Sequence, residues 1–431
     1  MRNRGWLILG LCAAISTAAL SAKAAEAPRL GSGPAYEALG QMAVLHQGRV
    51  KPLDTMSRQV IKQFYGDETI TFFDAEGKRA SSWGPVGAFL DMSARPEFWN
   101  DQPIIRVVYM PLKRMLLAGT AQQELRALAQ KPATAPADKT RLEALAREPV
   151  ITPEALAELA KTSQLPEADR KTLAALGARL GASLRWVSPR EIEDAKVTVE
   201  GQSVPFEMWV ADIVRRFEPD EEGPMVGRPK LPELEKNARD CAVALRHYQA
   251  IRGDRVRFLE PLDLVMPRPS SAAHLTYLAD VQKKYTTAAH GESKSEPFTP
   301  MEEESARALE KYLKDLPRED WHMPGTDKAF DTRFAAWLRE KSAWVPLSVL
   351  MESDAPDLVR AGFPSAKVEA FRSAYKALVD AEIASPGQIS VAPAAQVVQT
   401  ARELGESVGI YPSREDMTRE TRFNAFAPFT K

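Results

Sequence analysis

The side chains best suited to metal or proton chemistry are five histidines, which lie at His46, His247, His274, His290 and His322. Their spacing is not that of a metal-ligand set. His46 stands at a predicted hairpin turn, and His322 lies between Trp321 and Met323, so these two are the candidate axial ligands for a haem iron. The competing interpretation for each is a surface or hydrogen-bonded histidine. His322 and Met323 could both bind iron, but two neighbours on an irregular segment rarely point at one iron.

Motifs of common enzymes are absent from the sequence. It has no glycine-rich dinucleotide loop, phosphate loop, Gly-x-Ser-x-Gly elbow or His-Glu-x-x-His pair, so we do not expect an enzyme. It also has no Cys-x-x-Cys-His, which excludes covalent haem attachment. Cys241 has helical spacing with Ala242, Leu245 and Tyr248 and is predicted to be a small buried hydrophobe.

A charged corner is predicted around His46 to Arg58. Gln47 and Gly48 can form a tight hairpin turn, and Pro52 ends the returning strand. Asp54 or Thr55 can then cap a helix that ends at Gly66. In the simplest interpretation, the charges here only cap and solvate this corner.

The first 24 residues resemble a secretory signal. Arg2 and Arg4 precede an apolar run, and Ala22-Lys23-Ala24 offers a cleavage site; a retained anchor is the alternative. The remainder is predicted to be soluble in the periplasm. Without Arg2, Arg4 and Lys23 the basic residues fall from 57 to 54 against 58 acidic ones. The resulting net charge of about −4 suggests neither nucleic acid nor an anionic lipid surface as a partner.

The fold class expected from periodicity is mainly α with small β-hairpins (α+β). A helix that Ser365 caps and a second helix opened by Pro393 are expected near the end of the chain. The predicted divisions are a signal peptide at 1–24, an N-terminal α+β unit at 25–119, an Ala/Leu-rich helical insertion at 120–182 (a spacer or a partner-binding bundle), a mixed unit at 183–285, a mobile loop at 286–300 and a C-terminal helical unit at 301–431.

Two phrases near the ends of the chain carry a family resemblance. The first is Gly48-Arg49-Val50-Lys51-Pro52-Leu53-Asp54-Thr55, and the second is Tyr411-Pro412-Ser413 followed by Glu420 and Phe423-Asn424. With the block Pro96 to Val108, they resemble the extracytoplasmic region of the fused, multi-span cytochrome c assembly proteins of system II (CcsA/ResB-type). The insertion has no counterpart there, and the tryptophan-rich haem signature of those proteins is not among these 431 residues.

The resemblance implies a periplasmic accessory subunit of cytochrome c maturation. Such a subunit would dock on a separate multi-span CcsA-type assembly protein at the membrane and assist presentation of haem or apocytochrome c, with haem reached through the partner. The docking face implied by the two phrases consists of Arg49, Lys51, Asp54, Glu420 and Asn424. Two alternatives stay open: a periplasmic ligand-binding or envelope scaffold protein unrelated to haem, and a hydrolase with a dispersed active site.

Overall fold

The computed structural model is mainly helical, with small β-sheets, as the sequence predicted. The predicted signal peptide lies outside the residues that it describes, as does the middle of the predicted mobile loop. The described residues are 27–73, 78–148, 151–181, 184–199, 201–217, 230–253, 265–269, 272–289, 297–317, 322, 327–341, 344–409 and 411–426.

The N-terminal unit combines a three-stranded sheet, a separate hairpin and four helices. In the sheet, β5 lies between β1, which is parallel to it, and β4, which is antiparallel. The hairpin β2–β3 leads directly into helix α3. The elements are β1 (Arg29–Leu30), α2 (Pro34–Leu39), β2 (Ala43–His46), β3 (Arg49–Pro52), α3 (Leu53–Tyr65), β4 (Ile70–Phe73), β5 (Arg79–Trp83), α4 (Pro85–Ala94) and α5 (Pro96–Asn100).

Aromatic side chains form the centre of this unit. Trp99 is fully buried, and its ring meets Trp83 edge to face at 5.2 Å between centroids. Its indole N–H donates to Asp91 at 2.6 Å, which satisfies the one polar atom of the ring. Phe89 is also buried, whereas Phe98 is 39 % exposed. These aromatics therefore serve mainly as core.

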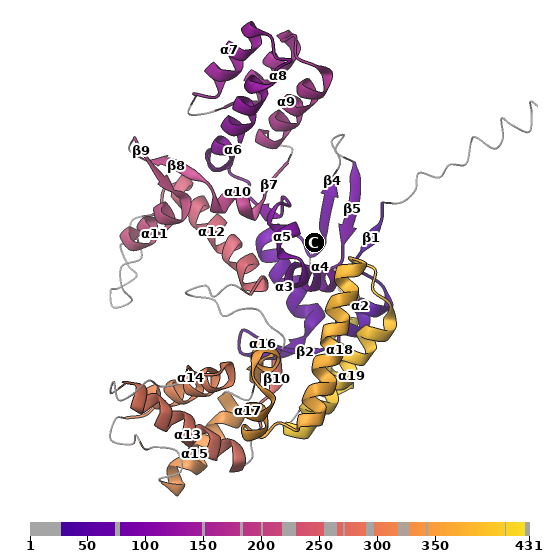
Figure 1. The fold of residues 1–431 in the computed structure, drawn as a ribbon, viewed down its shortest axis with the longest axis vertical. Helices are drawn as coiled ribbons and strands as arrows, with labels where there is room; N and C mark the ends of the chain where they lie inside the picture. The colour runs from indigo at the N-terminus through magenta and orange to yellow at the C-terminus, as the bar shows by residue number, and fades with distance from the viewer. Residues whose placement is uncertain are drawn as a thin grey trace, which may run out of the picture.

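The helical insertion grows out of the N-terminal unit at one end of the molecule (Figure 1). Its first helix starts before the predicted boundary at 119/120 and passes through it, because Leu112 and Leu116 are buried in the main core. Thr152 caps a later helix by accepting from the N–H of Ala155. The helices are α6 (Met110–Gln130), α7 (Pro136–Leu145), α8 (Pro153–Thr162) and α9 (Glu167–Leu180).

The middle unit packs helix α12 against α3. Phe64 and Tyr248 meet edge to face at 6.2 Å, and Cys241 is buried, which raises the pKa of its thiol to about 12. The prediction that Cys241 is a small buried side chain is confirmed. The elements are β6 (Ile105–Arg106), β7 (Trp186–Val187), α10 (Pro189–Glu193), β8 (Lys196–Val199), β9 (Gln202–Pro205), α11 (Phe206–Phe217) and α12 (Glu233–Ile251).

The C-terminal part contains a second, smaller core at the end of the molecule opposite the insertion (Figure 1). This core joins α13 to α14 and α15, so it crosses the predicted division at 286–300. The elements are β10 (Val265–Pro267), α13 (Ala272–Ala289), α14 (Pro300–Lys314), α15 (Lys328–Lys341), β11 (Trp344–Pro346), α16 (Leu347–Glu352), α17 (Ala355–Arg360), α18 (Ser365–Ala384), α19 (Val391–Val408) and α20 (Arg414–Phe426).

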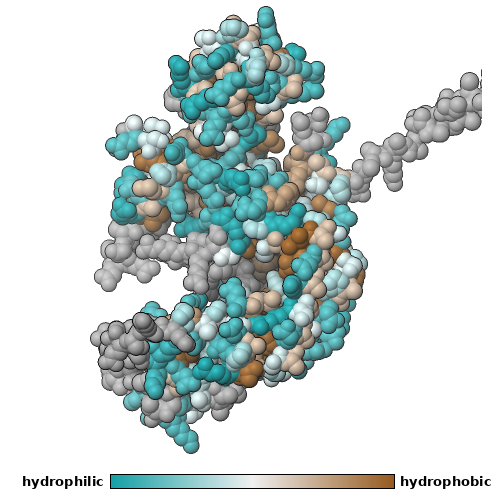
Figure 2. Space-filling view, in the orientation of Figure 1, coloured by the Kyte–Doolittle hydropathy of each residue, from teal (hydrophilic) through white to brown (hydrophobic). Residues whose placement is uncertain are grey.

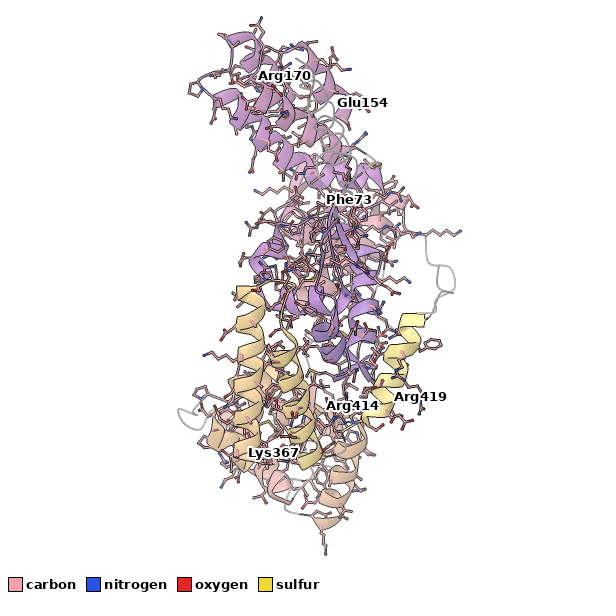
Figure 3. All side chains as sticks on the ribbon, turned by 90° about the vertical axis from the view of Figure 1, so that its right-hand side faces the viewer. Phe73, Glu154, Arg170, Lys367, Arg414 and Arg419 are labelled. Carbon is pink, nitrogen blue, oxygen red and sulfur yellow. The ribbon has the colours of Figure 1, made fainter. Side chains whose placement is uncertain are left out.

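The last three helices return to the N-terminal unit rather than forming a unit with α13–α15. Helices α18 and α19 lie along one side of it, against α4 and α2, and α20 lies on the other side, against β3 and α3 (Figure 3). On the face seen in Figure 2, hydrophilic side chains predominate, with an apolar patch between the sheet and the upper end of α18. The N-terminal unit is therefore held between segments from the far end of the chain.

The segment after Pro96 forms helix α5, because Pro96 occupies its first turn and Trp99 packs into the core. One local prediction is wrong. Ser365 does not cap α18; it is the first helical residue, after Pro364, and makes no capping hydrogen bond there.

Candidate functional site

The site is built on the hairpin β2–β3. His46 pairs with Arg49, and Ala43 pairs with Pro52, in antiparallel register. Gln47 and Gly48 have φ angles of 54° and 71°, so both turn residues are left-handed, as a two-residue hairpin of this twist requires. The hairpin predicted from Gln47-Gly48 is confirmed.

Helix α3 starts one residue before the predicted cap. Its first amide groups, those of Leu53 and Asp54, donate to the carbonyl oxygens of Met42 at 2.8 Å and Gly40 at 3.0 Å. Because distant carbonyl groups satisfy these donors, no side-chain cap is needed, and the predicted capping role of Asp54 or Thr55 is wrong. Both side chains are left available for other contacts.

The two phrases of the sequence meet at this hairpin. The Arg49 guanidinium and the Glu420 carboxylate of α20 are 2.5 Å apart. The Asn424 amide donates to Thr55 Oγ1 at 2.8 Å and to Asp54 Oδ2 at 3.2 Å. Residues about 370 positions apart in the sequence are thus joined at one place, which we call the corner: β2, β3, the first two turns of α3, Tyr411 and α20.

Tyr411 fixes the entry to α20. Its hydroxyl accepts from the N–H of Ala43 at 3.2 Å, and burial raises the pKa of that hydroxyl. The Arg402 guanidinium lies 5.3 Å from the centre of the same ring. Ser413 then caps α20, accepting from the N–H of Asp416 at 3.1 Å.

On the inner side of the corner, Lys51 and His46 form a buried polar pair. Lys51 Nζ donates to Gln59 at 2.8 Å and lies 3.3 Å from His46 Nδ1. Burial, together with the charge of Lys51 and the neighbouring His247, lowers the pKa of His46 to about 4. The imidazole is therefore neutral near pH 7, with Nδ1 turned to the lysine.

Asp54 also belongs to a chain of charges. The Arg58 guanidinium donates to both Asp54 oxygens, at 3.0 and 2.9 Å, and to Glu68 at 3.0 Å. Both contacts to Asp54 come from the same Arg58 Nε, which shares its hydrogen between the two oxygens, while Nη1 reaches Glu68. This pairing orients the Asp54 carboxylate toward Asn424 and fixes the start of α3 beneath α20.

The predicted docking residues differ in accessibility. Lys51 and Asp54 are only 4 % and 7 % exposed, and their polar groups have partners inside the chain. The side chain of Arg49 is 64 % exposed, despite its contact with Glu420, whose own side chain is 22 % exposed. All five predicted residues meet at the corner, but Arg49 is the one that presents most of its charged surface outward.

The two candidate haem ligands are not brought together. His46 lies on β2, while the exposed His322 packs its ring 6.1 Å from Phe330 of α15, and these two elements lie well apart in Figure 1. Over the part of the chain that the structure describes, no three histidine, cysteine or carboxylate side chains form a group that could hold a metal ion.

Sequence reasoning missed two contributors to the corner. Gln59 is the direct partner of Lys51, and His247 of α12 approaches His46 closely enough to affect its pKa. Gln59 lies one helical turn after Thr55, which is a signal for a shared helix face. Nothing local links His247 to the hairpin, because α12 reaches it only through tertiary packing on α3.

The polar groups of the corner are mostly paired with one another, which suits a structural joint that presents a limited charged surface. None of the described helices is both long enough and apolar enough to cross a bilayer. Comparison with known proteins found no matching family model, curated protein or solved structure.

Proposed function

We propose that this chain is a periplasmic accessory subunit of cytochrome c maturation. It docks through the corner on a multi-span CcsA-type assembly protein and assists presentation of haem or apocytochrome c. The haem-handling residues belong to the partner, and the role of this chain is to bind and position.

The observation that carries the proposal is the meeting of the two resembling phrases. Arg49 contacts Glu420, and Asn424 contacts Asp54 and Thr55. A chance likeness of two short phrases gives no reason for their residues to touch after some 370 intervening positions. A shared structural joint gives such a reason, since it needs the polar partners from both phrases at once.

The exposures divide the corner into two roles. Lys51 and Asp54 are buried and hold the joint together. Arg49, with most of its side chain in solvent, is the charge that a partner can reach. An exposed arginine of this kind adds specificity and association rate more than raw affinity.

A charge-exchange experiment separates docking from internal structure. Arg49→Glu places two acids together and is expected to lower both partner recovery and haem-stained c-type cytochromes. Arg49→Glu with Glu420→Arg restores the internal ion pair with its charges reversed. If the partner contacts Arg49 directly, the double variant stays defective although it is folded.

The measurement is recovery of a multi-span assembly protein with the tagged chain, alongside haem staining of cell extracts. The matched control exchanges another exposed pair, Arg360 and Asp280, which are 3.3 Å apart and lie far from the corner. Full function in the double corner variant would assign Arg49 and Glu420 a purely internal role. Normal cytochromes in cells lacking the chain would refute the proposed function and favour the scaffold or binding-protein alternative.

A further inference from the structure

Helix α20 has a buried and an outward face. Met417 is 5 % exposed and, with Glu420 and Asn424, faces the hairpin and α3. On the outward face, Phe423 is 72 % exposed, the highest value among the large apolar side chains of the described residues. Phe73 and Phe98, the other exposed phenylalanines of the described residues, are only 43 % and 39 % exposed, so the ring of Phe423 is unusually open to water.

Arginine side chains accompany this ring. Arg419 is 71 % exposed, although it pairs with Glu415 at 2.9 Å. Arg422 is exposed as well, and Figure 3 shows Arg414 and Arg419 along the outward face of α20. The acids of this face, Glu415 and Asp416, lie in the first turn, where they match the positive end of the helix dipole.

The charge pattern changes along the helix. After Glu420 the described part of α20 contains no acid, and Arg422 and Phe423 are both exposed there. The net charge of −1 for the whole chain therefore does not describe this end of α20.

We propose that the outward face of α20 contacts an anionic phospholipid surface. Arginines bind lipid phosphate while the phenylalanine ring enters the boundary between headgroups and acyl chains, which matches the two chemistries present on this face. Single contributions of either kind hold a protein at a bilayer only weakly, and the combination raises the affinity. The inference goes beyond the proposed function, because it requires neither haem nor a protein partner.

The test is flotation of the purified chain with phosphatidylcholine vesicles, with and without phosphatidylglycerol. We expect binding only when phosphatidylglycerol is present, and weaker binding as salt is raised. Each arginine near such a surface raises the partition coefficient about fivefold, so Arg419→Gln with Arg422→Gln should lower this coefficient about 30-fold. Phe423→Ala should lower it about tenfold, from the apolar area withdrawn from water.

The matched control lies on α11, which also carries an exposed methionine and two arginines. Met208→Ala with Arg215→Gln and Arg216→Gln should leave vesicle binding unchanged. Equal binding to both vesicle types, an equal loss in the α11 variant, or no binding at all would overturn the proposal. Because no partner is present, these outcomes are independent of the accessory role in cytochrome maturation.

Discussion

Asn424, rather than the Arg49–Glu420 ion pair, should hold α20 on the corner. The prediction compares Asn424→Ala with Arg49→Ala. Asn424 makes one hydrogen bond to a hydroxyl at 2.8 Å and one to a carboxylate at 3.2 Å. Such a bond contributes roughly 1 kcal/mol to stability when its acceptor is neutral and about 2 kcal/mol when its acceptor is charged. Partial exposure reduces the sum of the two bonds to about 2 kcal/mol.

The ion pair contributes less despite its short distance of 2.5 Å. The side chain of Arg49 is 64 % exposed, and pairs between solvent-exposed charges contribute at most about 1 kcal/mol, often nothing. The hydrogen bonds of the Asn424 amide to the buried Asp54 and to Thr55 therefore contribute more to stability than the ion pair of Arg49 and Glu420, which remains partly in water.

Hydrogen exchange of the α20 amides measures this difference directly. A loss of about 2 kcal/mol in the local opening free energy makes exchange about 30-fold faster. We expect this in Asn424→Ala, with less than fivefold acceleration in Arg49→Ala. The control is Arg419→Ala, which removes an exposed arginine from the same helix. Faster exchange in Arg49→Ala than in Asn424→Ala would refute the reasoning.

Three further predictions concern stability. Burial beside Asp91 raises the pKa of Glu382 to about 7. The stabilising contribution of Glu382 is therefore complete below the ordinary pKa of 4.5 and is lost as the pH rises through 7. In urea titrations the unfolding free energy should fall by up to about 3 kcal/mol between pH 5 and 8, and Glu382→Gln should flatten this fall. The pKa of His46, lowered from 6.5 to about 4 by burial, has the opposite effect. Its contribution is present above pH 6.5 and lost as the pH falls through 4, so His46→Gln should resist acid better than the parent chain, and an equal acid sensitivity would contradict this. Trp99→Ala, at a fully buried site, should cost about 3–5 kcal/mol in the same titrations, and a cost below 1 kcal/mol would place Trp99 outside the core.

The locally encoded parts of the fold could be predicted from the sequence. The Gln47-Gly48 turn, the left-handed Gly66 at the end of α3 and the Ser413 cap each depend on residues within a few positions of one another. The start of α3 could not, because the carbonyl oxygens of Gly40 and Met42 replace a side-chain cap. Local rules do not report which distant groups will satisfy a helix terminus.

The meeting of the two phrases was not predictable from spacing. Arg49 and Glu420 are 371 positions apart, and contact over such a distance follows from the packing of every element between them. The family resemblance assigned these residues to one docking face, but it did not predict which of them touch. The burial of Lys51 was equally hidden, since a lysine on a charged hairpin is normally solvated.

The insertion has a consequence for how this chain tolerates change over evolution. It leaves and re-enters the body of the protein at adjacent strands, because β6 pairs with β7 and the N–H of Val107 donates to the carbonyl of Arg185 at 2.7 Å. The entropic cost of a closed loop grows only slowly with its length. Lineages could therefore lengthen, replace or lose the outer helices α7–α9 while the frame that holds the corner stays the same.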